Sequence, residues 1–331
     1  MLLLLAGIAL LLLVLLDALW TTLAPHGAGP VTKGLARGLW SLALAVHRAA
    51  GGTHRLLAVV GPALLFLAFL WWVAGLWTGW VLVFESADGS VARAQTGEPA
   101  DLASTVYFVG FTLFTMGNGD YVPTTDGWEI ATAVAALSGL FVVTLAITYL
   151  VPVVSAVAAK RKLAAHLDDL GRSPVEIVLT AWDGSGFSSF EQHLGQIIPE
   201  LEMHTQRHLA YPVVHYFHST ERRTAAGPAI VAFAEALGLL SHAVAPDVRP
   251  APAVLVPAHR AVEGYLGTLR RGFVTAAADP LPHPSLQDLA DAGIPVVDAG
   301  EFDQAQRADA QEGRLLHALV RDTGWDWSVV S

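Results

Sequence analysis

The chain has 331 residues, 53% of them hydrophobic, and a mean hydropathy of +0.50, which excludes an ordinary soluble globular protein. It contains no cysteine, so disulfides and thiolate metal sites are excluded. The net charge of −10 is uneven, because residues 1–164 hold eight acidic and eight basic residues while residues 165–331 hold 21 and 11. The sequence therefore predicts a neutral apolar half and an acidic half that faces water. The acidic balance argues against nucleic acid as a partner.

Residues 1–23 form an apolar segment long enough to cross a bilayer, which takes roughly 20 residues. A cleaved signal peptide is the alternative, but the segment lacks a basic start and its apolar core is too long. Asp17 is unusual here, because a carboxylate facing lipid is costly. Either it lies near the membrane interface and reaches the headgroups, or it is buried and hydrogen-bonded to a neighbouring helix. We take the interface position as the expectation.

Residues 24–55 read as a linker that begins with a Pro/Gly stretch and continues as an amphipathic helix on the membrane surface. Residues 56–84 form a second predicted span, with four tryptophans in its later half where an interfacial aromatic belt would lie. The apolar stretch 102–114 is too short to cross and suits a re-entrant helix. Residues 127–158 form the last predicted span.

The basic residues of the short loops predict the orientation. Loop 24–55 carries Lys33, Arg37, Arg48 and Arg55 without an acid, and a basic run at residues 160–162 follows the last span. Loop 85–101 has one basic residue. We therefore expect a multi-pass protein of the inner (plasma) membrane, surrounded by lipid, with its N-terminus outside and its C-terminus cytoplasmic.

A glycine-rich stretch, TLFTMGNGDYVPTT at residues 112–125, lies between the short apolar helix and the last span. Non-helical backbone at membrane depth is tolerated only where it is buried in protein or lines a water-filled path. Glycine adopts positive φ at little cost, so alternating glycines let successive carbonyls point the same way. A ring of such carbonyls can replace the hydration shell of a cation. The helix before the stretch would aim its partly negative C-terminal end at that cation.

These residues resemble the pore-loop potassium channel superfamily, specifically its bacterial members with two core spans. The resemblance covers about residues 56–158. The family's filter pattern T-V-G-Y-G-D, often followed by P-T-T, stands here as T-M-G-N-G-D-Y-V-P-T-T. Tyr107 and Phe108 match the aromatic pair common in the family's pore helix, and Gly139 matches its hinge glycine. The resemblance implies a selectivity filter made of Thr115, Met116, Gly117, Asn118 and Gly119, which we call the filter segment.

The resemblance implies a homotetramer with potassium as the permeant ion, since one chain supplies only one filter strand. Asn118 departs from the pattern, because the family has an aromatic ring there that packs behind the filter. A non-selective channel for sodium and potassium is therefore the alternative. Phe111 and Phe114 are candidates to fill the space behind Asn118. Asp120 is expected at the outer mouth with other acids, which would raise the local cation concentration; of these, Asp101 could equally be a helix N-cap.

Residues 165–331 are expected to form a mainly α-helical cytoplasmic regulatory domain of unknown type, open to an unknown cytoplasmic ligand. Residues 176–182 could begin a helix or form a strand, residues 245–257 read as a proline-rich linker or ordered loop, and the prolines near residue 282 suggest another break. Trp325 and Trp327 are expected to dock onto a neighbouring domain or subunit, because an exposed pair would be adhesive.

Five histidines fall between residues 193 and 218, and two of them, His204 and His208, are four residues apart and share one helix face. They are candidates for a gating sensor of protons or a divalent metal. The alternative is that they are ordinary core and surface histidines.

The sequence thus predicts an all-α membrane protein with three transmembrane helices, a re-entrant pore helix and a mainly α C-terminal domain. The predicted function is a tetrameric cation channel without a cofactor. A membrane-anchored signalling protein with a vestigial pore is a further alternative. We expect no enzyme activity, because residues 165–331 show no nucleophile–base pair, P-loop or paired catalytic carboxylates, and a transporter would need internal repeats.

Overall fold

The computed structural model describes the chain except for residues 25–26, 271, 275–276, 278–285, 309 and 331. The chain divides into two compact units. The first unit comprises Met1–Leu39, Pro62–Val154 and Tyr211–Val213, and the second comprises Trp40–Gly61, Ser155–Ala210 and Val214–Ser331. The predicted linker 24–55 is divided between them, because the second half of its helix packs with the C-terminal residues. The predicted break near residue 282 lies outside the described residues.

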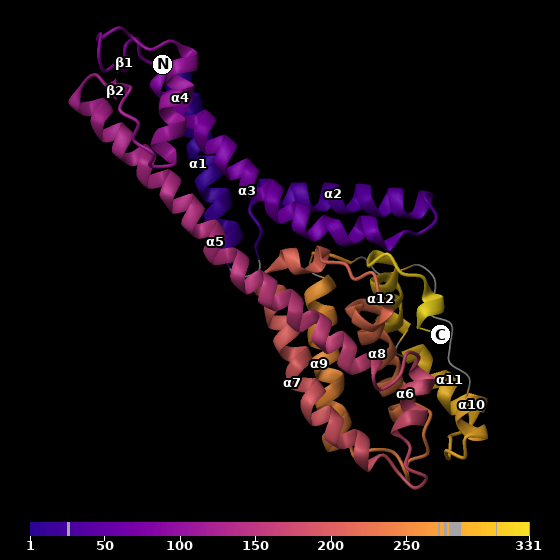
Figure 1. Cartoon of the computed structure of the whole chain (residues 1–331). Coiled ribbons are helices and arrows are strands. Elements are labelled where there is room, and N and C mark those ends of the chain that lie inside the picture. The colour runs from indigo at the N-terminus through magenta and orange to yellow at the C-terminus, as the bar shows by residue number, and fades with distance from the viewer. Residues whose placement is uncertain (25–26, 271, 275–276, 278–285, 309, 331) are drawn as a thin grey trace. The chain divides into compact units, whose positions relative to one another are not determined.

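Three helices in the described part of the chain are long and apolar enough to cross a membrane: α1 (Leu2–Leu23), α3 (His54–Phe84) and α5 (Asp126–Asp168). A shorter helix, α4 (Leu102–Leu113), stands between α3 and α5, and the strands β1 (Val91–Arg93) and β2 (Tyr121–Pro123) form an antiparallel pair beside it (Figure 1). This order matches the predicted spans and short helix, except that α5 continues about ten residues beyond its predicted end.

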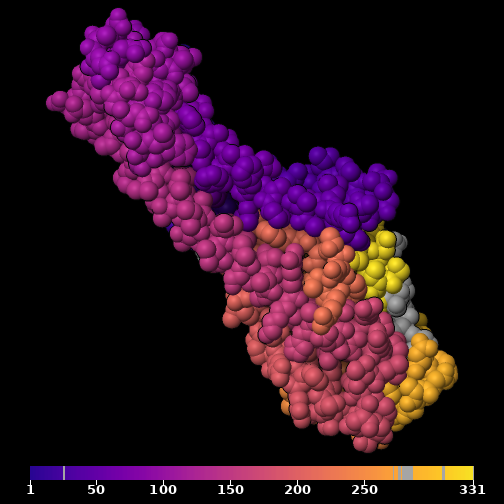
Figure 2. Space-filling model, viewed as in Figure 1, coloured from indigo at the N-terminus to yellow at the C-terminus, as the bar shows by residue number. Residues whose placement is uncertain are grey.

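Glycines allow α1 to pack closely against α3 in the first unit. A Cβ at Gly7 would lie 2.8 Å from the carbonyl oxygen of Gly79, and a Cβ at Gly79 would lie 2.8 Å from the side chain of Leu11. Small residues at a helix contact let two backbones approach, which is how helices associate in lipid. Apolar side chains of both helices then form the core of the unit, and the magenta atoms of α4 and α5 cover most of α1 on the face shown in Figure 2.

Asp17 is fully buried in the first unit, so the expectation that it reaches the membrane interface is wrong. Its carboxylate accepts hydrogen bonds from the backbone N–H groups of Val31 and Thr32 at 2.9 and 3.2 Å and from the Thr32 hydroxyl at 2.6 Å. The indole of Trp72 donates a fourth bond at 3.0 Å. Because a buried carboxylate must be hydrogen-bonded, these donors allow it to stay inside. Asp17 therefore joins α1 to α3 and caps the start of α2 (Pro30–Ala49).

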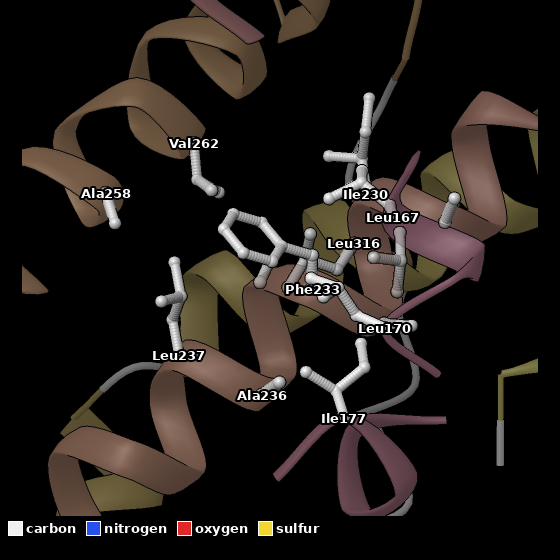
Figure 3. Packing of buried hydrophobic residues seen from close by; sticks show 14 of the residues in the cluster. Leu167, Leu170, Ile177, Ile230, Phe233, Ala236, Leu237, Ala258, Val262 and Leu316 are labelled. Carbon is white, nitrogen blue, oxygen red and sulfur yellow. The ribbon is translucent and has the colours of Figure 1, made fainter. Parts of the chain in front are cut away.

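The second unit is a helical bundle around α8 (Ala226–His242). Helix α8 is buried along nearly its whole length, and α7 (Ser188–Ala210) pairs with α9 (Pro252–Arg270) beside it. In Figure 3 the ring of Phe233 points toward Val262 of α9, with Leu316 close by. The other helices of the unit are α6 (Pro174–Ala181), α10 (Leu286–Asp291), α11 (Ala299–Ala308) and α12 (Ala310–Asp322), with short 3₁₀ turns at Pro212–Tyr216, Arg222–Thr224 and Trp327–Val329.

The expectation of a mainly α domain is confirmed, and two local points are resolved. Of residues 176–182, all but the C-cap Trp182 are helical in α6, and Ser173 caps the start of this helix by accepting a hydrogen bond from the Glu176 N–H at 3.2 Å. The interpretation of residues 245–257 as a linker or loop is wrong for its second half, since α9 begins at Pro252. Proline is tolerated in the first turn of a helix, where its missing N–H has no intrahelical partner.

Candidate functional site

Hydrogen bonds to neighbouring residues hold helix α4 at its N-terminus and near its middle. Asp101 caps its N-terminus by accepting a hydrogen bond from the Ser104 N–H at 2.9 Å, and the contacts with Ser104 lower the pKa of this carboxyl. The cap role was one of the two alternatives for this residue. At mid-helix, the indole of Trp77 donates to the Val106 carbonyl at 3.0 Å, so α3 holds the helix in place. The helix ends at Leu113, and its C-cap Phe114 stands directly before the filter segment.

Two backbone hydrogen bonds form the turn that joins α4 to the filter segment. The Thr115 N–H donates to the Thr112 carbonyl at 3.0 Å, and the Met116 N–H donates to the Phe111 carbonyl at 2.8 Å. Beyond this turn, φ is positive at every second residue: 55° at Thr115, 58° at Gly117 and 78° at Gly119. Glycine adopts these values freely, and a non-glycine residue at Thr115 does so at a cost of about 1 kcal/mol. Alternation of this kind turns successive carbonyls toward one side.

Tyr107 of α4 supports the filter segment from behind. Its hydroxyl accepts a hydrogen bond from the Asn118 side-chain amide at 2.6 Å and donates one to Asp120 at 3.2 Å. Its ring packs edge-on against Phe111, with ring centroids 5.2 Å apart. The structure therefore gives the position behind Asn118 to Tyr107, while Phe114 packs edge-on against Trp77 instead.

Polar contacts also hold strand β2, which follows the filter segment, to α4 and β1. The Tyr121 hydroxyl accepts hydrogen bonds from Ser104 of α4 at 2.8 Å and from the Arg93 guanidinium at 3.1 Å. Arg93 also lies over the Tyr121 ring, 5.3 Å from its centroid. The residues directly after the filter segment are thus held to both β1 and α4.

Gly139 of α5 packs against the C-terminal end of α4. A Cβ at this position would overlap the carbonyl oxygen of Leu113, so only glycine allows the two backbones to lie this close. Helix α5 is continuous through Gly139, and the role of this residue as a hinge stays a prediction. Nearby, the Trp80 indole donates to the Ser138 hydroxyl at 3.0 Å, which ties α3 to α5 at the same level.

The filter segment is exposed in the single chain, as are Phe114 and Asp120 on either side of it. Met116 is 63% exposed, although it is a large apolar residue. Behind the segment, Phe111 is buried, whereas Tyr107 is itself 42% exposed and holds the segment through hydrogen bonds. The segment therefore has a supported back and an open front, and this arrangement suits a strand whose carbonyl face meets other groups.

Comparison with known proteins agrees with this geometry. Residues 65–156, which run from α3 through the filter segment to α5, match the family described as "Ion channel". The chain belongs to the pore-loop ion channel family. It is also 32% identical over 325 residues to the uncharacterized membrane protein YdjJ of Bacillus subtilis (strain 168), a match that covers 98% of this chain and 94% of the relative. No solved structure matches the chain.

The histidines of this ion channel lie mostly inside the second unit. His204 and His208 share one face of α7, as predicted, but both are buried. Burial lowers the pKa of His204 to about 3 and holds the pKa of His208 well below its usual value. His208 contacts His215, with ring nitrogens 3.3 Å apart, and His215 contacts Asp322 at 2.9 Å. Among the described residues, no three side chains are placed to hold a metal ion. The structure therefore gives no support to a proton or metal sensor at His204 and His208.

Trp325 and Trp327 both pack within the second unit, so the expectation that they dock onto a neighbouring domain or subunit is not confirmed. The ring of Trp325 stacks on His54 with centroids 4.0 Å apart, and His54 in turn contacts His218, with ring nitrogens 2.9 Å apart. The sequence did not reveal this contact, nor the support of Asn118 by Tyr107. The aromatic pair in α4 was a visible signal for the latter, but the partner of its hydroxyl depends on how the chain turns after Phe114.

Proposed function

We propose that the protein is a homotetrameric cation channel that passes potassium through the filter segment. The observation that carries this proposal is the supported but open strand at residues 115–119, with positive φ at Thr115, Gly117 and Gly119. One such strand presents carbonyl oxygens on one side only. Four strands around an axis would enclose a cation in oxygen ligands, and closed cyclic symmetry is the usual way for identical chains to do so.

Potassium is favoured because the back of the filter segment is held by specific bonds despite the missing aromatic ring. Tyr107 joins Asn118 to Asp120 through one hydroxyl, so the side chain of Asn118 is fixed away from the strand's open front. A filter discriminates between cations of different size and hydration only if its oxygens keep their positions or field strength. Asp120 would add one carboxylate per chain at the outer mouth and attract cations there.

A channel that passes sodium and potassium equally is the second candidate. The specific observation in its favour is Asn118 itself, which is smaller than the family's aromatic residue and leaves the support to a single hydroxyl. The basic loops favour an inner-membrane protein with its N-terminus outside and its C-terminal domain in the cytoplasm. The permeant ion is the substrate, and we propose no resident cofactor.

The test is ion flux through the purified full-length protein in liposomes, with either a potassium or a sodium gradient and with barium as a blocker. We expect barium-sensitive potassium flux that exceeds sodium flux. Equal fluxes would favour the non-selective channel. Absence of flux in both gradients, in protein shown by native mass spectrometry to be tetrameric, would favour a vestigial pore that anchors a signalling domain. A monomer in the membrane would overturn the proposed assembly.

A further inference from the structure

A cavity of about 300 Å³ opens in the second unit between the end of α5 and the middle of α7. The part of α7 that lines it comprises residues at positions 199, 200, 203, 204 and 207, which fall on one helix face because they are spaced by three and four. Apolar atoms of Ala159, Pro199 and Met203 form part of its wall. Met203 is 52% exposed, so the cavity is open to solvent on this side.

The charged side chains of the cavity leave an excess of positive charge. Glu200 is already engaged at both oxygens, by the Lys162 ammonium at 2.7 Å and by a His166 ring nitrogen at 3.2 Å. Arg207 also lines the cavity, and among the residues that the structure describes no hydrogen bond or ion pair holds its guanidinium. Guanidinium presents a planar fork of donors that matches a carboxylate or phosphate group. The free cationic group therefore predicts an anionic ligand.

His204 provides a second, independent sign of a ligand. It lines the same cavity and is only 2% exposed, yet neither of its ring nitrogens has a hydrogen-bond partner among the residues that the structure describes. A buried polar group without a partner costs about 1–3 kcal/mol, so such groups are rare unless something else satisfies them. Because burial lowers its pKa to about 3, His204 stays neutral and offers one N–H donor and one acceptor.

We propose that this cavity binds a compact organic anion, whose phosphate or carboxylate group is held by Arg207 and Lys162 and hydrogen-bonded by His204, with a small apolar body against Pro199 and Met203. Such a ligand supplies the partners that Arg207 and His204 lack. It would also link α7 to α5, the helix that continues from the last span. The proposal concerns binding alone and does not depend on ion conduction.

The direct test is calorimetric titration of the full-length protein, in nonionic detergent, with phenyl phosphate as the probe and phenol as its uncharged counterpart. We expect one phenyl phosphate bound per chain and no measurable binding of phenol. Loss of a charged hydrogen-bonded partner in Arg207→Gln should weaken binding about tenfold or more. Lys162→Gln is the second variant, because the Lys162 side chain is 74% exposed and its loss should leave the fold intact.

Arg161→Gln is the matched control, since Arg161 is exposed, adjacent to Lys162 and outside the cavity lining. It should bind phenyl phosphate like the wild type. Equal binding by the Arg207, Lys162 and Arg161 variants would overturn the proposal, and so would absence of binding to folded wild-type protein, which would leave water as the partner of His204.

A second arm distinguishes the two sources of such an anion. The titration is repeated in nanodiscs of phosphatidylcholine with and without phosphatidic acid. Weaker binding of phenyl phosphate in the presence of phosphatidic acid, absent in Arg207→Gln, would identify a lipid headgroup as the occupant. Unchanged binding would identify a soluble metabolite that carries a phosphate or carboxylate.

Discussion

The two units of this channel complete their structures in different ways. In the first unit, the residues that carry the proposed chemistry stand exposed, and many large apolar side chains of the spans are exposed as well, among them Ile130, Leu137 and Val151 at 66–68%. In the second unit, α8 is surrounded by its own neighbours and large side chains such as Phe233 are fully buried. The second unit therefore covers its own apolar core, whereas the spans of the first unit expose apolar side chains that suit contact with lipid.

This difference explains where polar groups are found inside each unit. In the first unit the main buried polar group is Asp17, which joins three helices, whereas the hydrogen bond of Tyr107 behind the filter segment is exposed in the single chain. The second unit buries a set of histidines, some paired with each other and some without a partner. In the first unit we therefore expect single polar substitutions to act on assembly and conduction, and in the second on pH-dependent stability and ligand binding.

The largest effect is expected at the filter segment. Gly117→Ala places a Cβ at a residue with φ of 58°, which L side chains rarely adopt, so the strand should lose the alternation that aligns its carbonyls. We expect potassium flux into liposomes to fall at least about 100-fold, corresponding to about 3 kcal/mol. Gly89→Ala is the control, because Gly89 has φ of 70° in an outer turn with open space around it. Similar loss in both variants would mean that backbone strain alone is responsible.

The second largest effect is expected for thermal stability when Asp17, whose carboxylate connects α1 to α2 and α3, is replaced. Asp17→Ala removes the acceptor of four hydrogen bonds and leaves the N–H groups of Val31, Thr32 and Trp72 without it, which should cost about 3 kcal/mol. Thermal unfolding of the detergent-solubilised protein, followed by tryptophan fluorescence, should show a clear decrease in Tm. The exposed Asp88→Asn is the control and should not change Tm. An unchanged Tm for Asp17→Ala would show that the hydrogen bonds of Asp17 do not stabilise the folded protein.

The third prediction is that the stability of the second unit decreases in acid because it buries His218. The folded pKa of His218 is lowered to about 3 from 6.5, mainly by burial, so only the unfolded chain takes up a proton at this residue as the pH falls below about 6.5. Stability should therefore be unaffected above that pH and decrease toward pH 4. His218→Gln should reduce this loss by about 1.4 kcal/mol per pH unit. Urea unfolding at pH 7, 6, 5 and 4 measures it.

The exposed His193→Gln is the matched control for this pH series and should keep the wild-type slope. If His193→Gln and His218→Gln reduced the slope equally, burial would not be the cause of the pH response. If neither changed it, the second unit would not be the part of the protein that unfolds first in acid.

The smallest effect is expected behind the filter segment. Tyr107→Phe keeps the ring but removes the hydroxyl that joins Asn118 to Asp120. Loss of about 1 kcal/mol of hydrogen bonding should lower the potassium-to-sodium permeability ratio about fivefold without abolishing flux. Reversal potentials in planar bilayers measure the ratio. Tyr211→Phe is the control, because Tyr211 packs against Tyr149 of α5. A ratio unchanged by Tyr107→Phe would mean that the hydroxyl does not hold the filter.

Much of the first unit could be predicted from the sequence, because its physical signals are local. A run of apolar residues must be a helix in lipid, since only a helix satisfies its own backbone there. The length of residues 102–114 excluded a crossing, and the glycines at 117 and 119 marked the positions in the filter segment that adopt positive φ without strain. The resemblance to the pore-loop channel superfamily rested on the filter pattern between two spans, and the family match over residues 65–156 agrees with it.

Only the tertiary structure decided which polar groups meet. Asp17 lies 14 residues from Val31 and 55 from Trp72, so its burial could not be seen from its neighbours in the chain. The same holds for the Tyr107 hydroxyl, whose partners depend on a turn with an unusual φ at Thr115, and for His204, which shares a cavity with Lys162 of another helix. Periodicity fixes the face of a helix on which a side chain lies, but the packing of one helix against another determines what that face meets.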